Sequence, residues 1–348
     1  MTTVTRSSIL VPVIARRASA SILPYTLDFS LFGDGALPFP WLGSSTLTIS
    51  SGQAVNAPTL SDSVLVNGNM ETGDPPSSWT PVGTPTASSV ADERTGGAGA
   101  ASYSIARNGT SNFSIYQAAA AIGAQGWYRL NGWKKRIDSY LRLYYSTGSY
   151  DTALVNVGST WENDVHDGFK TIAGGYVQAA CFATVDAQSS LFDDISLKEY
   201  TTPAEMFKVI FTGFALVTAK VNITATPQAG ALGVVCCVDS PTNPQNYTLA
   251  LMAGGASAST KRFVQLLKCV GGTKSIVIGV TEVTYAAGAS LEIRHTAATT
   301  FQVWYNGTQV STDKTIADAG IISNKYHGIF SGLTGASSGV DAFFCETV

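Results

Sequence analysis

The stretch TFQVWYNGTQVS, residues 300–311, decides the fold class of this chain. Apolar and polar residues alternate along it, as they do in a strand with one buried face. Asn306-Gly307 in its middle is the pair favoured in a two-residue hairpin turn, because both central positions need a positive φ. The stretch therefore predicts two antiparallel strands joined by a tight turn.

Strand patterns of the same kind recur along most of the 348 residues. Turn residues separate them, and no sustained helical period interrupts them. Many short strands with turns between them are typical of antiparallel sandwiches, so we predict an all-β chain. The clearest patterns cover residues 46–50, 128–135, 140–146, 175–185, 191–200, 207–214, 247–252, 275–285 and 291–296.

The composition excludes several classes of function. Lys and Arg number 21 and Asp and Glu 24, so charged residues make up 13% of the chain, against about 25% in an ordinary soluble protein. The net charge is −3 and no dense basic run exists, which argues against a nucleic-acid binder of the strongly basic kind. No apolar stretch reaches the roughly 18 residues that span a bilayer. We expect neither nucleic acid nor a membrane as a partner.

The first 24 residues differ in character from the rest of the chain. They carry Arg6, Arg16 and Arg17 and no acidic residue. Their apolar run is short for a signal peptide and is interrupted by Pro12, and proline also opposes a long helix. We predict an extended arm over residues 1–24 that anchors the protein on a partner.

Three sequence motifs mark the start, the centre and the end of the middle segment of the chain. They are LVNGNMETGDPPSSWT (65–80), WYRLNGWKKR (127–136) and LFDDISLKEY (191–200). The segment 63–202 thereby resembles the carbohydrate-binding modules of the cellulase-C type. This resemblance implies a β-sandwich that binds a polysaccharide.

The two flanks of that segment carry a second resemblance. Residues 28–60 are similar to the first strands of a concanavalin A-like, laminin G-like lectin sandwich, and residues 289–332 to its last strands. We predict one discontinuous host domain, residues 25–62 and 203–348, with the jelly roll 63–202 inserted in a loop. Insertions at exposed loops cost little when the inserted ends lie close together.

Strand alternation suggests a carbohydrate-binding face on the middle segment. In the two central strand patterns, Asn131 and Trp133 lie opposite the apolar side of the first, and Arg142 and Tyr144 opposite that of the second. If both strands belong to one sheet, these four side chains line one groove, and aromatic rings with polar neighbours suit sugars. The alternative is that a loop or the neighbouring domain covers Trp133.

Glu71 and Asp193 are the metal candidates. Alternation places Asp193 on the inward face with Ile195 and Leu197, where a carboxylate needs a cation or several donors. The resemblance to the carbohydrate-binding modules implies a structural Ca²⁺ held by the two carboxylates, and hard oxygen ligands suit this ion. The alternative is a carboxylate bonded to backbone amides.

The thiols and imidazoles show no metal-binding spacing. Each cysteine lies in an apolar run, which predicts a small buried side chain rather than a ligand. The histidines are far apart in the sequence and form no zinc motif. These residues are Cys181, Cys236, Cys237, Cys269, Cys345, His166, His295 and His327.

Catalysis finds little support in the sequence. Glycoside hydrolysis uses two carboxyl groups that converge across a cleft, and no such arrangement of acids is recognisable. Nucleophile-elbow, phosphate-loop and dinucleotide fingerprints are also missing from the sequence. We expect that the protein is not an enzyme.

The arm, the host with its insert, and the low-charge composition together resemble accessory proteins of tailed-bacteriophage particles. The resemblance implies a structural protein on the virion surface, in a head decoration, a neck or a tail fibre. It also implies contacts with other virion subunits through the arm, a homo-oligomer, and binding of host or environmental polysaccharide. The alternatives are a free extracellular bacterial carbohydrate-binding or adhesion protein, and a polysaccharide-degrading enzyme.

Overall fold

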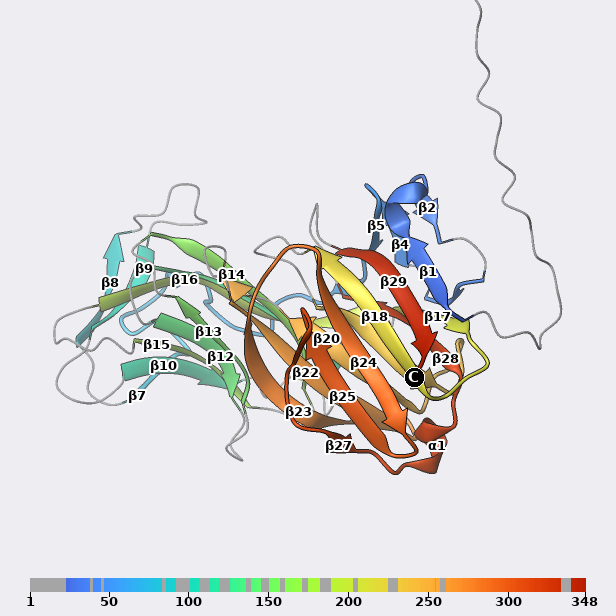
Figure 1. Cartoon of the computed structure of the whole chain (residues 1–348). Helices are drawn as coiled ribbons and strands as arrows, with labels where there is room; N and C mark the ends of the chain where they lie inside the picture. The colour runs from blue at the N-terminus through green and yellow to red at the C-terminus, as the bar shows by residue number, and fades with distance from the viewer. Residues whose placement is uncertain are drawn as a thin grey trace, which may run out of the picture.

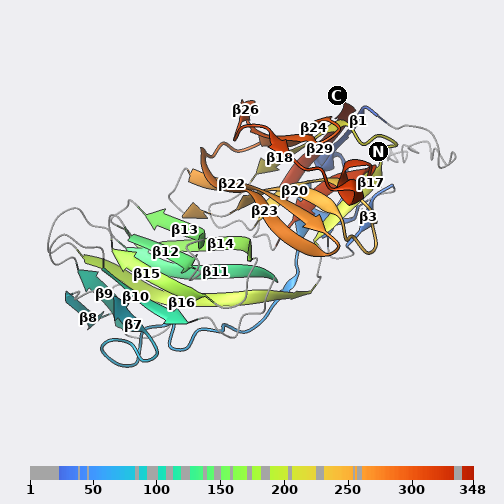
Figure 2. The same ribbon diagram turned by 90° about the horizontal axis from the view of Figure 1, so that it is seen from below.

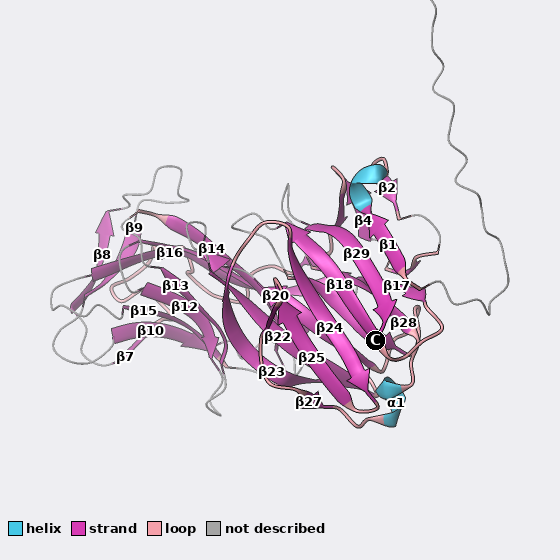
Figure 3. Ribbon diagram, in the orientation of Figure 1, coloured by secondary structure: helices cyan, strands magenta, loops and turns pink. Residues whose placement is uncertain are grey.

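The computed structural model confirms the predicted all-β architecture: its strands form antiparallel sheets that pack as sandwiches. Helix is confined, in the described residues, to the 3-10 turn Phe29–Leu31 and the four-residue α1 (Ala319–Ile322) (Figure 3). No described helix has the length and apolar character needed to cross a membrane. The structure describes residues 23–37, 40–44, 47–82, 86–91, 101–106, 113–118, 126–135, 139–144, 150–156, 160–170, 175–181, 189–202, 206–224, 231–253, 255–256, 261–332 and 339–348.

Two sheets form what we call the host sandwich. The ten-stranded sheet has the order β2-β4-β5-β29-β18-β24-β25-β26, with β1 on β29 and β27 on β25. In Figure 1 the N-terminal strands lie beside the C-terminal β29, so the two ends of the chain share one sheet. The strands are β1 (Tyr25–Asp28), β2 (Gly35–Ala36), β4 (Leu47–Ser50), β5 (Gln53–Asn56), β18 (Val217–Thr224), β24 (Ala289–Ala297), β25 (Thr300–Tyr305), β26 (Thr308–Gln309), β27 (Lys314–Thr315) and β29 (Gly339–Thr347).

The facing sheet of the host sandwich has the order β23-β22-β20-β19-β28-β17-β3. The apolar core between the two sheets draws alternate residues from each, among them Ile210, Val221 and Phe343. The strands of this sheet are β3 (Leu42–Gly43), β17 (Phe207–Phe211), β19 (Leu232–Val238), β20 (Tyr247–Ala253), β22 (Lys261–Val270), β23 (Thr273–Thr284) and β28 (Tyr326–Ser331).

The middle of the chain forms a second body, which we call the insert sandwich. Its five-stranded sheet has the order β13-β12-β15-β10-β7, and its seven-stranded sheet the order β21-β14-β11-β16-β9-β8, with β6 on β16. Tyr128, Leu130 and Leu141 belong to the core between them. The strands are β6 (Thr59–Leu60), β7 (Thr80–Val82), β8 (Thr86–Ala91), β9 (Ala101–Ala106), β10 (Phe113–Ala118), β11 (Gly126–Lys135), β12 (Ser139–Tyr144), β13 (Tyr150–Asn156), β14 (Glu162–Lys170), β15 (Tyr176–Cys181), β16 (Ser189–Thr202) and β21 (Gly255–Ala256).

The chain enters and leaves the insert sandwich at neighbouring points. β6 pairs with the end of β16, where Leu60 lies opposite Tyr200, and the hydroxyls of Thr59 and Thr201 are 2.8 Å apart. Figure 2 shows β16 running from the insert sandwich toward the host sandwich. The entering and leaving segments are therefore held together by strand pairing.

The two sandwiches share a third apolar cluster. Trp127 of β11 packs on Phe330 of β28 with ring centroids 4.7 Å apart, and β21 pairs with β14. The host sheet is thereby covered on both faces, which explains why every residue of β19 and of β20 is buried. These two strands consequently lack the alternation seen in β18.

The hairpin predicted around Asn306-Gly307 is confirmed. Asn306 and Gly307 have φ values of 46° and 77°, and β25 pairs with β26 directly across them. All five cysteines are buried with free thiols, which confirms the predicted burial.

Candidate functional site

The four residues predicted to line one groove do not lie together. β11 belongs to the seven-stranded sheet and β12 to the five-stranded sheet. Leu130 and Leu141 point into the core between these sheets, so Asn131 and Trp133 point out of one side of the sandwich and Arg142 out of the other. The two strands thus belong to different sheets, and these residues do not line a common groove. Tyr144 ends β12, but its side chain lies outside the described residues.

The face with Trp133 is turned toward the host sandwich. Trp127, on the same side of β11, belongs to the cluster that joins the two bodies, and host-derived β21 extends the same sheet. The side-chain oxygens of Asn131 and Asn163 are buried there without a hydrogen-bond partner in the described part of the chain. Trp133 is partly exposed, but the neighbouring host sandwich packs on this side of β11.

The expected inward position of Asp193 is wrong. Asp193 lies directly opposite Trp133 of β11, whereas its neighbour Phe192 belongs to the core. A β-bulge follows at Asp194, whose φ is 47°, and it returns Ile195 to the core side. Paired residues share one side of a sheet, so Asp193 points away from the core, although it is fully buried.

Each predicted metal-binding carboxylate accepts a hydrogen bond from the backbone. The amide of Ala101 donates to Glu71 Oε1 at 3.0 Å, and the amide of Asp194 donates to Asp193 Oδ1 at 2.7 Å. Neither acid belongs, within the described ranges, to a cluster of three or more potential metal ligands. A structural Ca²⁺ held by this pair stays a prediction.

The residues of the predicted anchoring arm, Arg6, Arg16 and Arg17, lie outside the described residues.

The outer face of the five-stranded sheet carries a connected set of polar side chains. The amide of Gln178 is at the centre: Arg142 Nε donates to its Oε1 at 2.7 Å, and the Tyr140 hydroxyl donates to the same oxygen at 3.2 Å. Gln178 Nε2 donates in turn to Ser114 Oγ at 2.6 Å. The strand register places Arg142 opposite Gln178, so three strands contribute to one surface.

Aromatic rings border this polar centre. Tyr116 and Tyr176 lie on the same face of the sheet with ring centroids 5.1 Å apart, and both are partly exposed. The Arg142 guanidinium lies over the ring of Tyr140 at 4.7 Å. We call Ser114, Tyr116, Tyr140, Arg142, Tyr176 and Gln178 the tyrosine face.

The hydroxyl at the buried edge of the tyrosine face stays protonated. Burial raises the pKa of Tyr140 to about 12, with Arg142 opposing the shift. Tyr140, Gln178 and Ser114 are buried and hold the guanidinium of Arg142 in place, whereas Arg142, Tyr116 and Tyr176 are partly exposed. A guanidinium donates to sugar hydroxyls, and tyrosine rings stack on the apolar faces of sugars. The arrangement therefore suits a carbohydrate ligand.

Of the six residues of the tyrosine face, only Arg142 was predicted from the sequence to bind carbohydrate. Gln178 and Tyr176 were missed, although they alternate with the core residue Val177 in the same way. The signal was present, but the sequence does not tell which sheet each strand joins.

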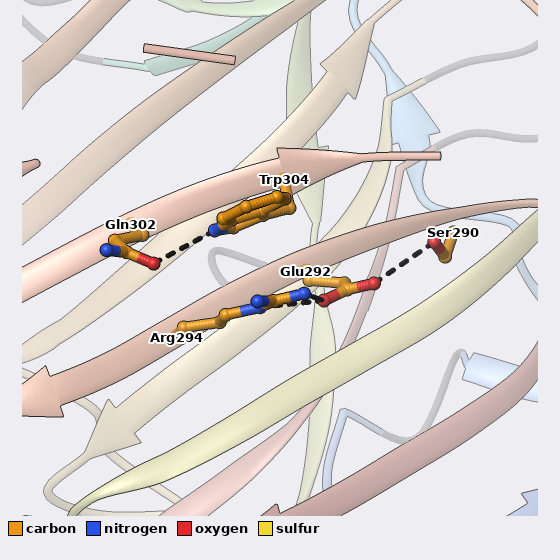
Figure 4. A network of polar contacts seen from close by, with 5 residues as sticks. All are labelled: Ser290, Glu292, Arg294, Gln302 and Trp304. Carbon is orange, nitrogen blue, oxygen red and sulfur yellow. Dashed lines mark hydrogen bonds and ion pairs between the residues drawn. The ribbon is translucent and has the colours of Figure 1, made fainter. Parts of the chain in front are cut away.

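A second polar network lies on the outer face of the host sandwich (Figure 4). Arg294 donates two hydrogen bonds to Glu292 Oε2, at 3.0 and 2.7 Å, and Ser290 donates to Glu292 Oε1 at 3.2 Å. The Arg294 guanidinium stacks on the ring of Trp304 at 4.1 Å from its centroid. The Nε1 of Trp304 donates to Gln302 Oε1 at 3.0 Å. These contacts fix the outward side chains of β24 and β25 relative to one another.

Comparisons with known proteins find distant likenesses in structure. No family model matches the chain, and no curated protein matches its sequence. The carbohydrate binding module CBM66 from Bacillus subtilis is similar at 14% identity, with 42% of this chain and 82% of that chain covered and a TM-score of 0.28.

The receptor binding domain of botulinum neurotoxin D is similar at 8% identity, with 70% and 92% covered and a TM-score of 0.22. The binding domain of serotype G is similar at 8% identity, with 88% and 97% covered and a TM-score of 0.21. At such scores these likenesses add nothing to the argument from geometry.

Proposed function

We propose that the protein is a non-enzymatic carbohydrate-binding protein and that the tyrosine face of the insert sandwich takes the sugar. The observation that carries the proposal is the combination, on one face of a sheet, of two partly exposed tyrosine rings with the partly exposed Arg142, which the buried Gln178 and Ser114 hold in place. The rings supply stacking area, and the amide fixes the positions of the donors around it.

The residues of this face support binding rather than hydrolysis. The sequences of β10, β12 and β15 contain no Asp or Glu, whereas glycoside hydrolysis uses a pair of carboxyl groups. The central acceptor, Gln178 Oε1, already receives two hydrogen bonds, which holds it in one orientation. Such a preorganised surface, whose charged group is the Arg142 guanidinium, favours an uncharged or weakly acidic polysaccharide.

A glycan array probed with the full chain tests this proposal. Tyr116→Ala removes a stacking ring, so we expect the apparent affinity for the bound glycans to fall about tenfold, as the loss of about 1.4 kcal/mol would cause. Tyr116→Phe retains the ring and should bind within about twofold of the wild type.

Two further variants serve as matched controls. Trp133→Ala and Trp304→Ala each remove an aromatic side chain from another face of the molecule and should leave glycan binding unchanged. Loss of binding in Trp133→Ala with normal binding in Tyr116→Ala would contradict the assignment to the tyrosine face. Turnover of the bound glycans by the wild type would contradict the non-enzymatic part.

We further propose that the protein acts on the surface of a bacteriophage particle, held to other virion subunits by the arm 1–24. The support is the acid-free, proline-bearing arm and the low-charge composition. Mass spectrometry of purified particles should detect the chain, and a chain without residues 1–24 should fold but not be incorporated. Secretion of the intact protein by bacteria that carry no phage would instead favour a free adhesion protein.

A further inference from the structure

Two cysteines and two histidines that are distant in sequence meet inside the host sandwich. Cys236 and Cys237 lie just before the last residue of β19, His327 lies on the neighbouring β28, and His295 lies on β24 of the facing sheet. All four residues are fully buried. We propose that Cys236, Cys237 and His327 bind one Zn²⁺ ion and that His295 moves in as the fourth ligand.

A β-bulge brings the two adjacent thiols to one side. In a regular strand Cys236 and Cys237 would point to opposite faces. Here the register between β19 and β28 slips between Val235 and Val238, so that both cysteines lie opposite His327 alone. Cys237 takes a φ of 56°, and both thiols join the core between the two host sheets. Bulges re-aim side chains in this way next to functional sites.

The distances between the ligand atoms suit a tetrahedral ion. Cys236 Sγ is 3.5 Å from Cys237 Sγ and 3.2 Å from His327 Nδ1, and Cys237 Sγ is 3.5 Å from His295 Nδ1. Ligand atoms around a tetrahedral zinc with two sulfurs and two nitrogens lie about 3.3–3.8 Å apart. The ligand atoms of Cys236, Cys237 and His327 already lie within 4.8 Å of one another. His295 is close to Cys237 alone and must move inward to become the fourth ligand.

The outer ring nitrogens of both histidines contact backbone carbonyls. His327 Nε2 lies 2.9 Å from the Phe214 oxygen, so Nε2 carries the proton and Nδ1 is an acceptor. This Nδ1 accepts from the Cys237 backbone amide at 3.2 Å and lies 3.2 Å from the Cys236 thiol. His295 Nε2 lies 3.4 Å from the Ala298 oxygen, and its ring stacks on Phe301 with centroids 4.2 Å apart. Metal-bound histidines are oriented by such contacts.

Each histidine must exchange one partner to complete the site. His327 Nδ1 gives up the hydrogen bond from the Cys237 amide. His295 Nδ1 lies 2.8 Å from the Ala215 oxygen, and this contact gives way when Nδ1 turns its lone pair to the ion. Ala215 belongs to the loop 212–216, in which Phe214 and Leu216 are exposed. The carbonyls of Phe214 and Ala215 in this loop thus contact both histidines of the cluster.

The chemistry of the four groups selects the ion. Thiolate and imidazole ligands favour zinc over Ca²⁺ or Mg²⁺, which take oxygen ligands. Two cysteines and two histidines are one of the ligand sets of structural zinc sites.

Cobalt titration of the full chain, freed of metal by a chelator, tests the proposal. The wild type should take up one Co²⁺ per chain with a thiolate-to-cobalt charge-transfer band, and one equivalent of Zn²⁺ should remove that band. Loss of an outer-shell partner already lowers metal affinity about 10–100-fold, so Cys236→Ser and His327→Ala should lower it at least as much.

Cys269→Ser is the matched control. Cys269 is another buried thiol of the host sandwich, but it donates to the Gln245 oxygen at 3.2 Å, away from the cluster. The Cys269→Ser variant should bind cobalt with the affinity of the wild type. The proposal fails if wild-type chain, folded by circular dichroism, takes up no cobalt, or if Cys236→Ser retains the wild-type affinity. It also fails if the wild type has lost two hydrogens to a Cys236–Cys237 disulfide.

Discussion

At the scale of single residues, the ion pair of Arg294 with Glu292 shows how burial determines the contribution of a charge to stability. Its partner Glu292 is 8% exposed in its side chain, and Arg294 itself 31%. Lys268 is equally exposed, at 32%, but its partner Asp318 is 29% exposed. Removing the cation leaves a buried carboxylate in the first pair and a hydrated one in the second.

We therefore expect Arg294→Ala to lower the free energy of unfolding by about 1–3 kcal/mol, because Glu292 loses its charged partner in a buried place. Lys268→Ala should cost about 0–1 kcal/mol, as exposed ion pairs do. Urea denaturation of both variants beside the wild type measures the difference. Equal losses in the two variants would show that the burial of Glu292 does not control the cost.

At the scale of secondary-structure elements, the β25–β26 hairpin depends on the backbone of its two turn residues. A Cβ at Gly307 would meet nothing within 4 Å, yet the φ of this residue is +77°. Gly307→Ala should therefore lower the free energy of unfolding by about 1–2 kcal/mol through backbone strain alone. Gly279 of β23 is equally open but has no such φ, so Gly279→Ala should not destabilise the protein. Thermal unfolding of both variants compares the two costs.

The same elements show what the sequence predicts and what it does not. The Asn306-Gly307 turn was predictable because its residue types match the required φ values. The faces of Asp193 and Cys237 were not, because each depends on a bulge that adds one residue to a strand and reverses the alternation after it. Arg142 was placed on the correct face of β12, but the sequence does not tell that β11 and β12 join different sheets.

At the scale of the whole molecule, the two sandwiches are coupled through Trp127. Its ring packs on Phe330 in the cluster that covers the second face of the host sheet. Trp127→Ala should lower the free energy of unfolding by about 3–5 kcal/mol, as other truncations of large aromatic residues in a core do. The lost contacts are those between the two sandwiches.

Differential scanning calorimetry should then resolve two unfolding transitions in Trp127→Ala where the wild type shows one. Trp133→Ala, on the same strand but outside this cluster, is the control and should keep the single transition. A single transition in Trp127→Ala, with an unchanged midpoint, would mean that the sandwiches do not depend on this contact.

The assignment of sugar binding to the tyrosine face is tested most directly by hydrogen exchange of the full chain with and without a glycan identified on the array. A bound glycan should slow exchange in peptides that contain β10, β12 and β15, where Tyr116, Arg142 and Gln178 lie. Exchange in β11, β24 and β25 should stay unchanged. Protection of β24 and β25, or of β11 without β12 and β15, would contradict the account.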